Sequence, residues 1–178
     1  VMAGDFSNPL TWGGTPPTGS GTVVINHAVN LDIDYMHTSG SITINAAGSV
    51  SSTNPMRVFA LNYPSGTASL TVNGSLNVAR VPFITGTILN NGTFEVDSLF
   101  NTADLTNGSN GVINSSQFMI GTGGTLINNG NIITVNFYNI DTVTNSGTIT
   151  TTDFCNSKTF VNNSTAEINA NHDFSNID

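Results

Sequence analysis

An asparagine-rich corner that ends in glycine recurs along the chain at nearly regular intervals, as in LNNGTF and LINNGNI. The step from one corner glycine to the next stays almost constant, and NNSTAEI continues the series with Thr165 in the glycine position. Periods of this length are typical of solenoid proteins, in which each repeat forms one coil and stacks on its neighbours. The corner glycines are Gly74, Gly92, Gly111, Gly130 and Gly147.

Apolar residues keep the same phase as the corners. From Gly92 onward, an apolar residue lies two positions after each corner, and a phenylalanine follows five or six positions later. Independent β-hairpins are the alternative, because Asn-Gly is also a strong hairpin signal, but hairpins would not hold phenylalanine in phase. We therefore predict an all-β chain that forms a parallel β-helix (β-solenoid) with about 18–19 residues per coil. The phenylalanines expected in one inward column are Phe100, Phe118, Phe137, Phe154 and Phe174.

The corner itself has two expected roles. Glycine adopts positive φ freely and asparagine does so better than other side chains, which suits a tight turn between strands. Stacked asparagines also hydrogen-bond amide to amide along the axis of an in-register ladder. We expect both a left-handed glycine at each turn and an asparagine ladder beside it.

Composition agrees with this fold and excludes several function classes. Charged residues make up only 8% of the chain, and the strong helix formers Glu, Lys, Arg and Gln are scarce. The net charge is −8 with three basic residues, Arg57, Arg80 and Lys158, so a nucleic-acid-binding patch is excluded and an anionic membrane surface is disfavoured. No apolar run is long enough for membrane insertion. The single Cys155 excludes an internal disulfide framework and a multi-cysteine zinc site.

The period fails upstream of Gly74. Gly48 would be the preceding corner, but the step from Gly48 to Gly74 is much longer than one period, and the surplus falls in SSTNPMRVFALNYPSG, residues 51–66. This segment is predicted to be either a lateral loop or a wider coil. Departures from a repeat often carry the binding site of a solenoid, although a loop that only shields a coil edge is the alternative. The candidate ligand-binding residues are Arg57, Phe59 and Tyr63.

The two ends of the chain differ from the repeats. Residues 1–40 are predicted to form an N-terminal β cap, which protects the exposed strand edges of the first coil, and Trp12 is expected to plug that coil. Residues 41–178 are predicted to form the coils. The chain stops at HDFSNID, just after a phenylalanine of the repeat and without a polar cap sequence. We therefore expect this to be a fragment of a longer chain that continues beyond residue 178.

Candidate chemistry is sparse. Asp153 and Asp173 each precede a phenylalanine of the repeat, so they are expected to stack in adjacent coils, where two carboxylates could bind calcium. Catalysis on acidic polysaccharides would need Lys or Arg in this phase, and none is there, so we predict that the chain is not an enzyme. His172 next to Asp173 is a dyad without a nucleophile. The matching positions of earlier coils are taken to be Asn136, Gln117 and Leu99, so polar surface variation is the alternative.

Two further patterns favour an ordinary polar surface over a binding site. Asp32 and Asp34 lie on one strand face, but their spacing matches no defined calcium loop, so a solvated strand face is expected. A flat threonine array could bind ice, but only one coil has threonine on both sides of the apolar residue after its corner, at Thr148 and Thr150.

Two resemblances concern the origin of the chain. The repeats, most plainly GTLINNGNI and VTNSGTITT, resemble the passenger regions of autotransporters and filamentous-haemagglutinin-type secreted adhesins over about residues 66–178. The head resembles the opening of secreted Bacteroidetes surface proteins and the G8-type β module, with Phe6 where another tryptophan is expected. Both resemblances imply export and an extracellular or cell-surface role, and neither implies catalytic residues. The matching head residues are Trp12, Gly13, Gly14, Pro17, Val23, Ile25, Val29 and Leu31.

These observations together predict a non-catalytic extracellular or cell-surface segment, an adhesin or rigid stalk, whose outer amides and hydroxyls contact glycans or surface proteins. The alternative is a carbohydrate-binding module or an accessory domain of a polysaccharide-degrading enzyme. Surface-exposed aromatic residues, with Phe59, Tyr63, Phe83 and Tyr138 as the candidates, would favour the alternative, and burial of the same residues would favour the stalk.

Overall fold

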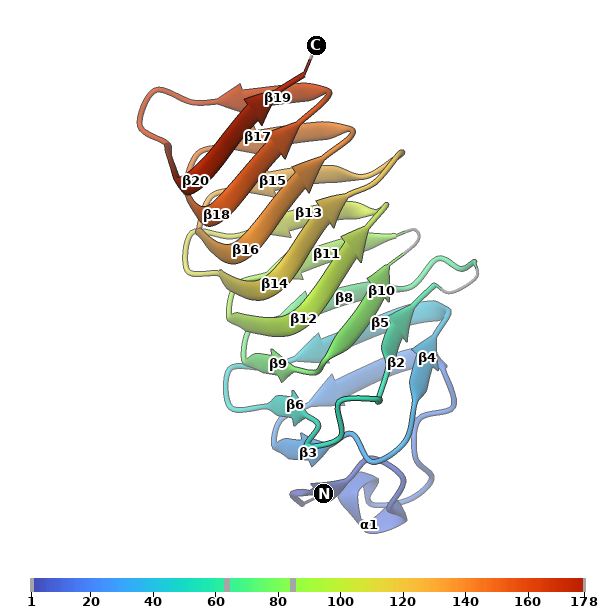
Figure 1. Cartoon of the computed structure of the whole chain (residues 1–178). Helices are drawn as coiled ribbons and strands as arrows, with labels where there is room; N and C mark the ends of the chain where they lie inside the picture. The colour runs from blue at the N-terminus through green and yellow to red at the C-terminus, as the bar shows by residue number, and fades with distance from the viewer. Residues whose placement is uncertain (1, 63–64, 84–85, 178) are drawn as a thin grey trace.

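Two parallel β-sheets lie against one shared apolar core that runs the length of the chain (Figure 1). The computed structural model describes residues 2–62, 65–83 and 86–177. Among these described residues, the first sheet contains 12 strands: β1 (Gly4–Asp5), β3 (Ala28–Asn30), β4 (Tyr35–His37), β6 (Ser49–Ser51), β7 (Phe59–Leu61), β9 (Ser75–Asn77), β10 (Arg80–Phe83), β12 (Thr93–Asn101), β14 (Val112–Ile120), β16 (Asn131–Asn139), β18 (Thr148–Asn156) and β20 (Glu167–Asn176). The second contains eight: β2 (Ser20–Ile25), β5 (Ser39–Ile44), β8 (Ser69–Val72), β11 (Thr87–Asn90), β13 (Asp104–Asn107), β15 (Thr125–Asn128), β17 (Thr142–Asn145) and β19 (Thr159–Asn162).

The chain alternates between the two sheets and forms about eight stacked turns, so the predicted β-solenoid is confirmed. Each strand pairs in parallel with the equivalent strand of the next turn. Thr125 pairs with Thr142, and Thr142 pairs with Thr159, so these coils are slightly shorter than the predicted period. The helical content of the described residues is one short helix, α1 (Pro9–Trp12), which is too short to span a membrane.

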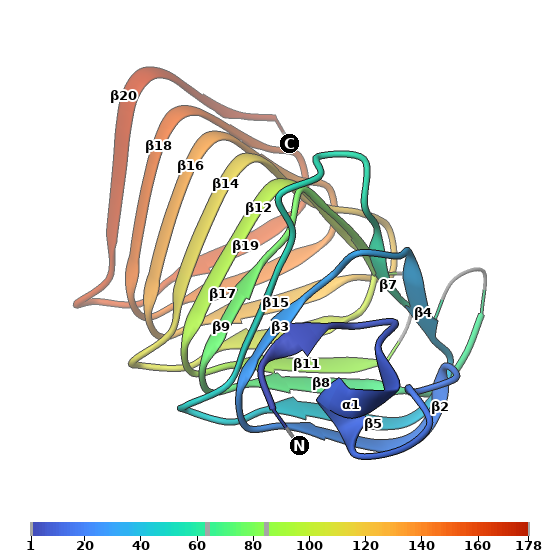
Figure 2. The same cartoon turned by 90° about the horizontal axis from the view of Figure 1, so that it is seen from below.

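The first sheet changes shape along the stack. In the lower turns each coil contributes two separate strands to it, such as β3 and β4, whereas in the upper turns one long strand covers both positions. Figure 2 shows these long strands, β12 to β20, curving side by side around the core. The bend lets two residues in a row face outward, as Asp97 and Ser98 do between the buried Val96 and Leu99.

The described residues of the 51–66 segment belong to a wide coil. Ser41 pairs with Ser69, a step well above the regular period, and within this coil β7 pairs with β4 below and β10 above. The surplus therefore surrounds a strand that is part of the stack. The Asn62 side-chain amide connects the end of the wide coil to the start of the next one. It donates to Ala68 O at 2.9 Å and accepts from Ala68 N at 2.7 Å.

The aromatic column is confirmed with one correction. Phe118, Phe137, Phe154 and Phe174 are in register, but their partner in β12 is Leu99, and Phe100 points outward with 43% of its surface exposed. The prediction for Phe100 was wrong because the bend, at which two residues in a row face outward, makes the step from the preceding apolar residue to the column five positions. A step of six reaches the column only where the strand also has a bulge. The last coil does have a bulge, between Ala170 and Asp173, and it brings Phe174 into the column.

The corner glycines do not adopt positive φ, so the expected left-handed turn was wrong. They are required for space. A Cβ atom built on Gly92 or Gly147 would collide with the carbonyl oxygen of the corner glycine one coil below. That carbonyl also accepts a hydrogen bond from the coil above, as Gly130 O does from Thr148 N at 2.9 Å. The corner backbones approach so closely that no side chain fits between them.

The asparagine ladder is confirmed. Asn90, Asn107, Asn128, Asn145 and Asn162 are in register, and the amide nitrogen of each of the first four donates to the amide oxygen one coil above at 2.7–2.8 Å. These four side chains are fully buried. Because every one of the four amides both donates and accepts, the polar ladder satisfies itself inside the core.

The base of the stack begins earlier than residue 40. Residues 20–37 form β2, β3 and β4, which pair with the next turn and are therefore the first coil. Beneath them Phe6, only 1% exposed, fills the core position, with its ring 4.4 Å from that of Tyr35. Trp12 packs behind Phe6 and donates from its indole nitrogen to Phe6 O at 2.7 Å, so Trp12 supports the plug that Phe6 forms.

Candidate functional site

Two outward strips of side chains run along the first sheet, on the part of the long strands that follows the bend. We call them the apolar strip and the polar strip. On each long strand the members of the two strips are two residues apart, so the strips lie side by side on the same outward face. The apolar strip is Phe100, Met119, Tyr138 and Cys155. The polar strip is Arg80, Ser98, Gln117, Asn136, Asp153 and Asp173.

A groove of about 730 Å³ lies at the lower end of these strips. Phe100 and Met36 form its exposed apolar walls, with 43% and 54% of their surfaces accessible, and the Phe100 ring lies over Gly121 of the next coil. Arg80 and Asp34 place opposite charges at the same groove. The remaining lining residues are Val58, Ala60, Val81 and Ser98. An apolar floor with a few polar groups is the usual composition of a ligand site.

The predicted ligand-binding residues have separate positions. Arg57 lies near the groove, because its Nη1 is 3.6 Å from Asp34 Oδ1, and the same oxygen accepts from Val58 N at 3.1 Å. Phe59 is fully buried beside Tyr35, so the prediction that it contacts a ligand was wrong. Phe59 is buried because it occupies the column position of the wide coil, in register with Tyr35. Tyr63 lies outside the described residues.

Phe100 was missed as a surface residue, and the same register error explains why. Once Leu99 is placed in the column, strand alternation puts Phe100 outside, next to Met119 and two coils below Tyr138. Tyr138 is 38% exposed. The aromatic surface of this face therefore comes from Phe100 and Tyr138 on the regular coils. The buried Phe59 of the wide coil contributes none.

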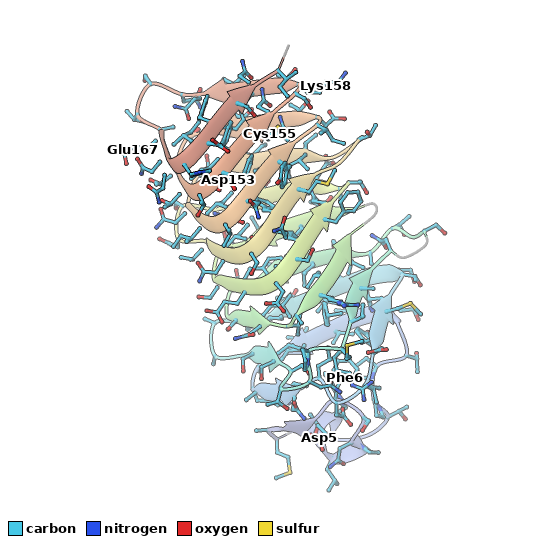
Figure 3. All side chains as sticks on the ribbon, viewed as in Figure 1. Asp5, Phe6, Asp153, Cys155, Lys158 and Glu167 are labelled. Carbon is cyan, nitrogen blue, oxygen red and sulfur yellow. The ribbon has the colours of Figure 1, made fainter. Side chains whose placement is uncertain are left out.

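A second cluster lies at the upper end of the polar strip. Asp153 and Asp173 are paired in register, which confirms that they stack in adjacent coils. The equivalent residues of β12 and β10 are Ser98 and Arg80, so the expectations of Leu99 at this position and of no basic residue in this phase were wrong. His172 joins them: its Nδ1 is 3.0 Å from Asp153 Oδ1 and 3.3 Å from Asp173 Oδ2. Figure 3 shows Asp153 and Cys155 on β18, near the upper end of the stack.

The two carboxylates act on the imidazole. The hydrogen bond with Asp153, together with the negative charges of Asp173 and Asp153, raises the pKa of His172 above its ordinary value. The cluster therefore favours a positive charge at this point, supplied by a proton or by a cation. Calcium at the two aspartates stays a prediction.

A polar groove of about 690 Å³ lies along the strand bends on the outer face of the first sheet. Its lining contains the acidic Glu95 and Asp97, and Glu95 accepts a hydrogen bond from Asn77 of the coil below. Hydroxyls deeper in the bend bond to one another or to backbone, as Ser115 Oγ does to Thr134 Oγ1 at 3.1 Å. This groove offers carboxylates and amides without an aromatic side chain among its described lining residues.

Asp32 and Asp34 have structural partners. The Asp32 carboxylate accepts from Ser7 N at 3.0 Å and from Ser7 Oγ, so it holds the N-terminal segment against the first coil. Asp34 contacts Arg57 and the Val58 backbone. Each carboxylate therefore serves a different contact, and the two do not form one site.

Comparison with known proteins gave no match, whether with protein-family models, with curated proteins or with solved structures.

Proposed function

We propose that this chain is a non-catalytic rod segment that acts outside the cell or on its surface and presents its outer face to glycans or surface proteins. The observation that carries this proposal is the stack itself. About eight turns share one core, and buried asparagine amides connect consecutive coils from Asn90 to Asn162. Such a stack is stiff and repeats the same surface positions at the spacing between neighbouring strands, roughly 4.8 Å.

The outer face supports a contact role for the rod. The apolar strip places Phe100 and Tyr138 two coils apart, and the exposed Gln117 and half-buried Asn136 of the polar strip lie beside them. Aromatic faces cover the apolar faces of sugar rings while amides bond to hydroxyls, so this pairing suits a glycan chain that lies along the strips. The net charge of −8 disfavours acidic polysaccharides, so we propose neutral ones.

The second candidate is a carbohydrate-binding module or an accessory domain of a polysaccharide-degrading enzyme. The groove beside Phe100 favours it, because a concave site with Arg80 and Asp34 at its walls is more selective than a flat face. The two candidates differ in use more than in chemistry. An adhesin segment would hold a cell or particle through many weak contacts, whereas a module would bind one soluble glycan at the groove.

The decisive experiment is native affinity electrophoresis of the chain through gels that contain neutral or acidic polysaccharides. We expect retardation by a neutral glycan, and we expect Phe100→Ala and Tyr138→Ala each to reduce it. Ile127→Ala is the matched control, because Ile127 is 45% exposed on β15, in the other sheet. If Ile127→Ala weakened retardation as much as Phe100→Ala, the face that carries the apolar and polar strips would not be the contact surface.

Two further measurements separate the parts of the proposal. Incubation with the retarding polysaccharide, followed by an assay for new reducing ends or unsaturated products, tests the non-catalytic role, and turnover would contradict it. Labelling of intact source cells with an antibody against the chain tests location. Signal only after the cells are permeabilised would contradict an extracellular or cell-surface role.

A further inference from the structure

The Asp153–His172–Asp173 cluster has the dimensions of a metal site. One Asp153 oxygen, one Asp173 oxygen and one His172 nitrogen lie within 4.8 Å of one another, and the two distances to the nitrogen are 3.0 and 3.3 Å. Ligand atoms around a zinc ion at bond lengths of about 2.0–2.1 Å are separated by roughly 3.3 Å. The two distances to the nitrogen are therefore close to the spacing that one such ion requires.

A bulge in β20 lies next to the cluster. The register of β20 on β18 shifts by one residue between Thr151 and Asp153, so one extra residue is inserted before Asp173. In the regular coils the bend already turns two consecutive residues outward, as it does Asp97 and Ser98, and in β20 the pair at this position is His172 and Asp173, both of which reach Asp153. Bulges are commonly found where a strand has to re-aim a side chain.

The cluster is confined to one pair of coils. Below Asp153 the polar strip continues with Asn136, Gln117 and Ser98, which are uncharged. A general solvation role would be served equally well by any of these residues. The three groups that can ligate a metal occur together only where the bulge occurs among the described coils.

The ligand set distinguishes between metal ions. Calcium takes six to eight oxygen ligands, and magnesium likewise prefers oxygen. One imidazole nitrogen with two carboxylates suits zinc and neighbouring divalent ions, for which three protein ligands leave one position open. That position would face solvent, since the His172 and Asp173 side chains are 70% and 76% exposed.

We propose that Asp153, His172 and Asp173 form a surface site for a divalent ion of the zinc type, with Zn²⁺, Co²⁺ and Ni²⁺ as the expected occupants. The ion cross-links β18 to β20 and leaves a coordination position open to solvent. This proposal does not depend on what the apolar strip binds.

The test is calorimetric titration of the whole chain, cleared of metal with EDTA and dialysed, with ZnCl₂ and separately with CaCl₂. One equivalent of Zn²⁺ is expected to bind, and His172→Gln and Asp153→Asn are each expected to weaken it by about tenfold or more. Asp97→Asn is the matched control, because it removes the same charge from another exposed position of the first sheet. Cys155→Ser tests the thiol that lies two residues from Asp153.

Each outcome decides the question. The proposal is supported if Asp97→Asn and Cys155→Ser bind as the wild type does and the other two variants do not. It is overturned if the wild type binds no Zn²⁺, which would leave an imidazolium–carboxylate ion pair only, or if His172→Gln binds Zn²⁺ normally. Calcium binding that Asp153→Asn abolishes and His172→Gln leaves intact would also overturn it, in favour of a site made by the two aspartates. Far-UV circular dichroism confirms that each variant is folded, and a change in the ligand-field absorption of bound Co²⁺ between the wild type and His172→Gln reports whether the imidazole is a ligand.

Discussion

Asn107 Nδ2 donates to Asn128 Oδ1 of the next coil at 2.8 Å, and both side chains are fully buried. The same nitrogen lies within 3.2 Å of the Gly111 and Asn131 carbonyl oxygens, so the amide also fixes the corner of its own coil and of the next. The same hydrogen bond repeats from coil to coil, so the ladder fixes the register between neighbouring strands. A slip of one residue would leave these buried amides without partners, at a cost of about 1–3 kcal/mol for each group.

Asn128→Asp tests the ladder. The substitution keeps the acceptor for Asn107 but replaces the donor that serves Asn145 Oδ1 at 2.7 Å with a buried carboxylate oxygen. We expect a loss of about 3–5 kcal/mol in the free energy of unfolding at neutral pH. Guanidinium denaturation followed by circular dichroism measures it. Asn129→Asp is the control at the exposed neighbour and is expected to change stability by less than about 0.5 kcal/mol. Equal losses in unfolding free energy for the two variants would mean that the buried ladder does not add to the stability of the stack.

Gly147→Ala tests why the corners contain glycine. Its backbone does not need positive φ, but a Cβ there would press on Gly130 O and the Asn129 backbone of the coil below. We expect a loss of about 1–3 kcal/mol from overpacking, measured by the same denaturation. Gly14→Ala is the control, since a Cβ there meets nothing within 4 Å and φ is not positive. If the two variants were equally stable, close stacking would not be the reason for the glycine.

The repeat could be predicted from the sequence because every coil solves the same packing problem with the same residue types. A buried ladder accepts asparagine, a crowded corner accepts glycine, and a wide core accepts phenylalanine. Each requirement leaves its own residue at a fixed phase. The role of the glycine could not be predicted in the same way. Positive φ and close backbone approach both select glycine, and only the stacking distance between Gly130 and Gly147 decides between them.

The candidate sites were less predictable, because strand bends and bulges change which face a residue occupies without changing the composition. Phe100 and Leu99 are neighbours, and a one-residue difference in count moved the aromatic ring from the core to the groove. The bulge in β20 shifts the register by one residue, so that Asp173 pairs with Asp153 and Phe174 with Phe154. The pairing of Asp153 with Asp173 could be predicted, because each precedes a phenylalanine of the column.

The pH dependence of stability is expected to report on His37. This ring is buried, with its Nδ1 2.8 Å from the Tyr35 hydroxyl and its Nε2 3.2 Å from Gly21 O. Burial lowers the pKa of His37 below its ordinary 6.5, and the Gly21 contact opposes this only in part. Burial likewise raises the pKa of Tyr35 to about 12, so its hydroxyl stays protonated and can donate to His37.

Protonation of His37 therefore favours the unfolded chain. The contribution of the neutral ring to stability is complete above pH 6.5, the unfolded value, and decreases as the pH falls from there toward the lower folded-state pKa. We expect the denaturation midpoint of the wild type to fall more between pH 8 and pH 5 than that of His37→Asn, with all other titrating groups common to both. Parallel midpoints in the two proteins would show that another group is responsible.

Truncation of the phenylalanines tests the corrected column. Phe137 is fully buried, with its ring 5.3 Å from those of Phe118 and Phe154, so Phe137→Ala is expected to cost about 3–5 kcal/mol. Phe100 lies outside the core, and Phe100→Ala is expected to cost less than about 1 kcal/mol. Leu99→Ala, which empties the column position of the same strand, should resemble Phe137→Ala with a loss of about 2–5 kcal/mol. The order of Phe100→Ala and Leu99→Ala in one denaturation series is the sharpest check on the register of β12. A larger loss for Phe100→Ala would return that ring to the core and remove the apolar wall from the groove.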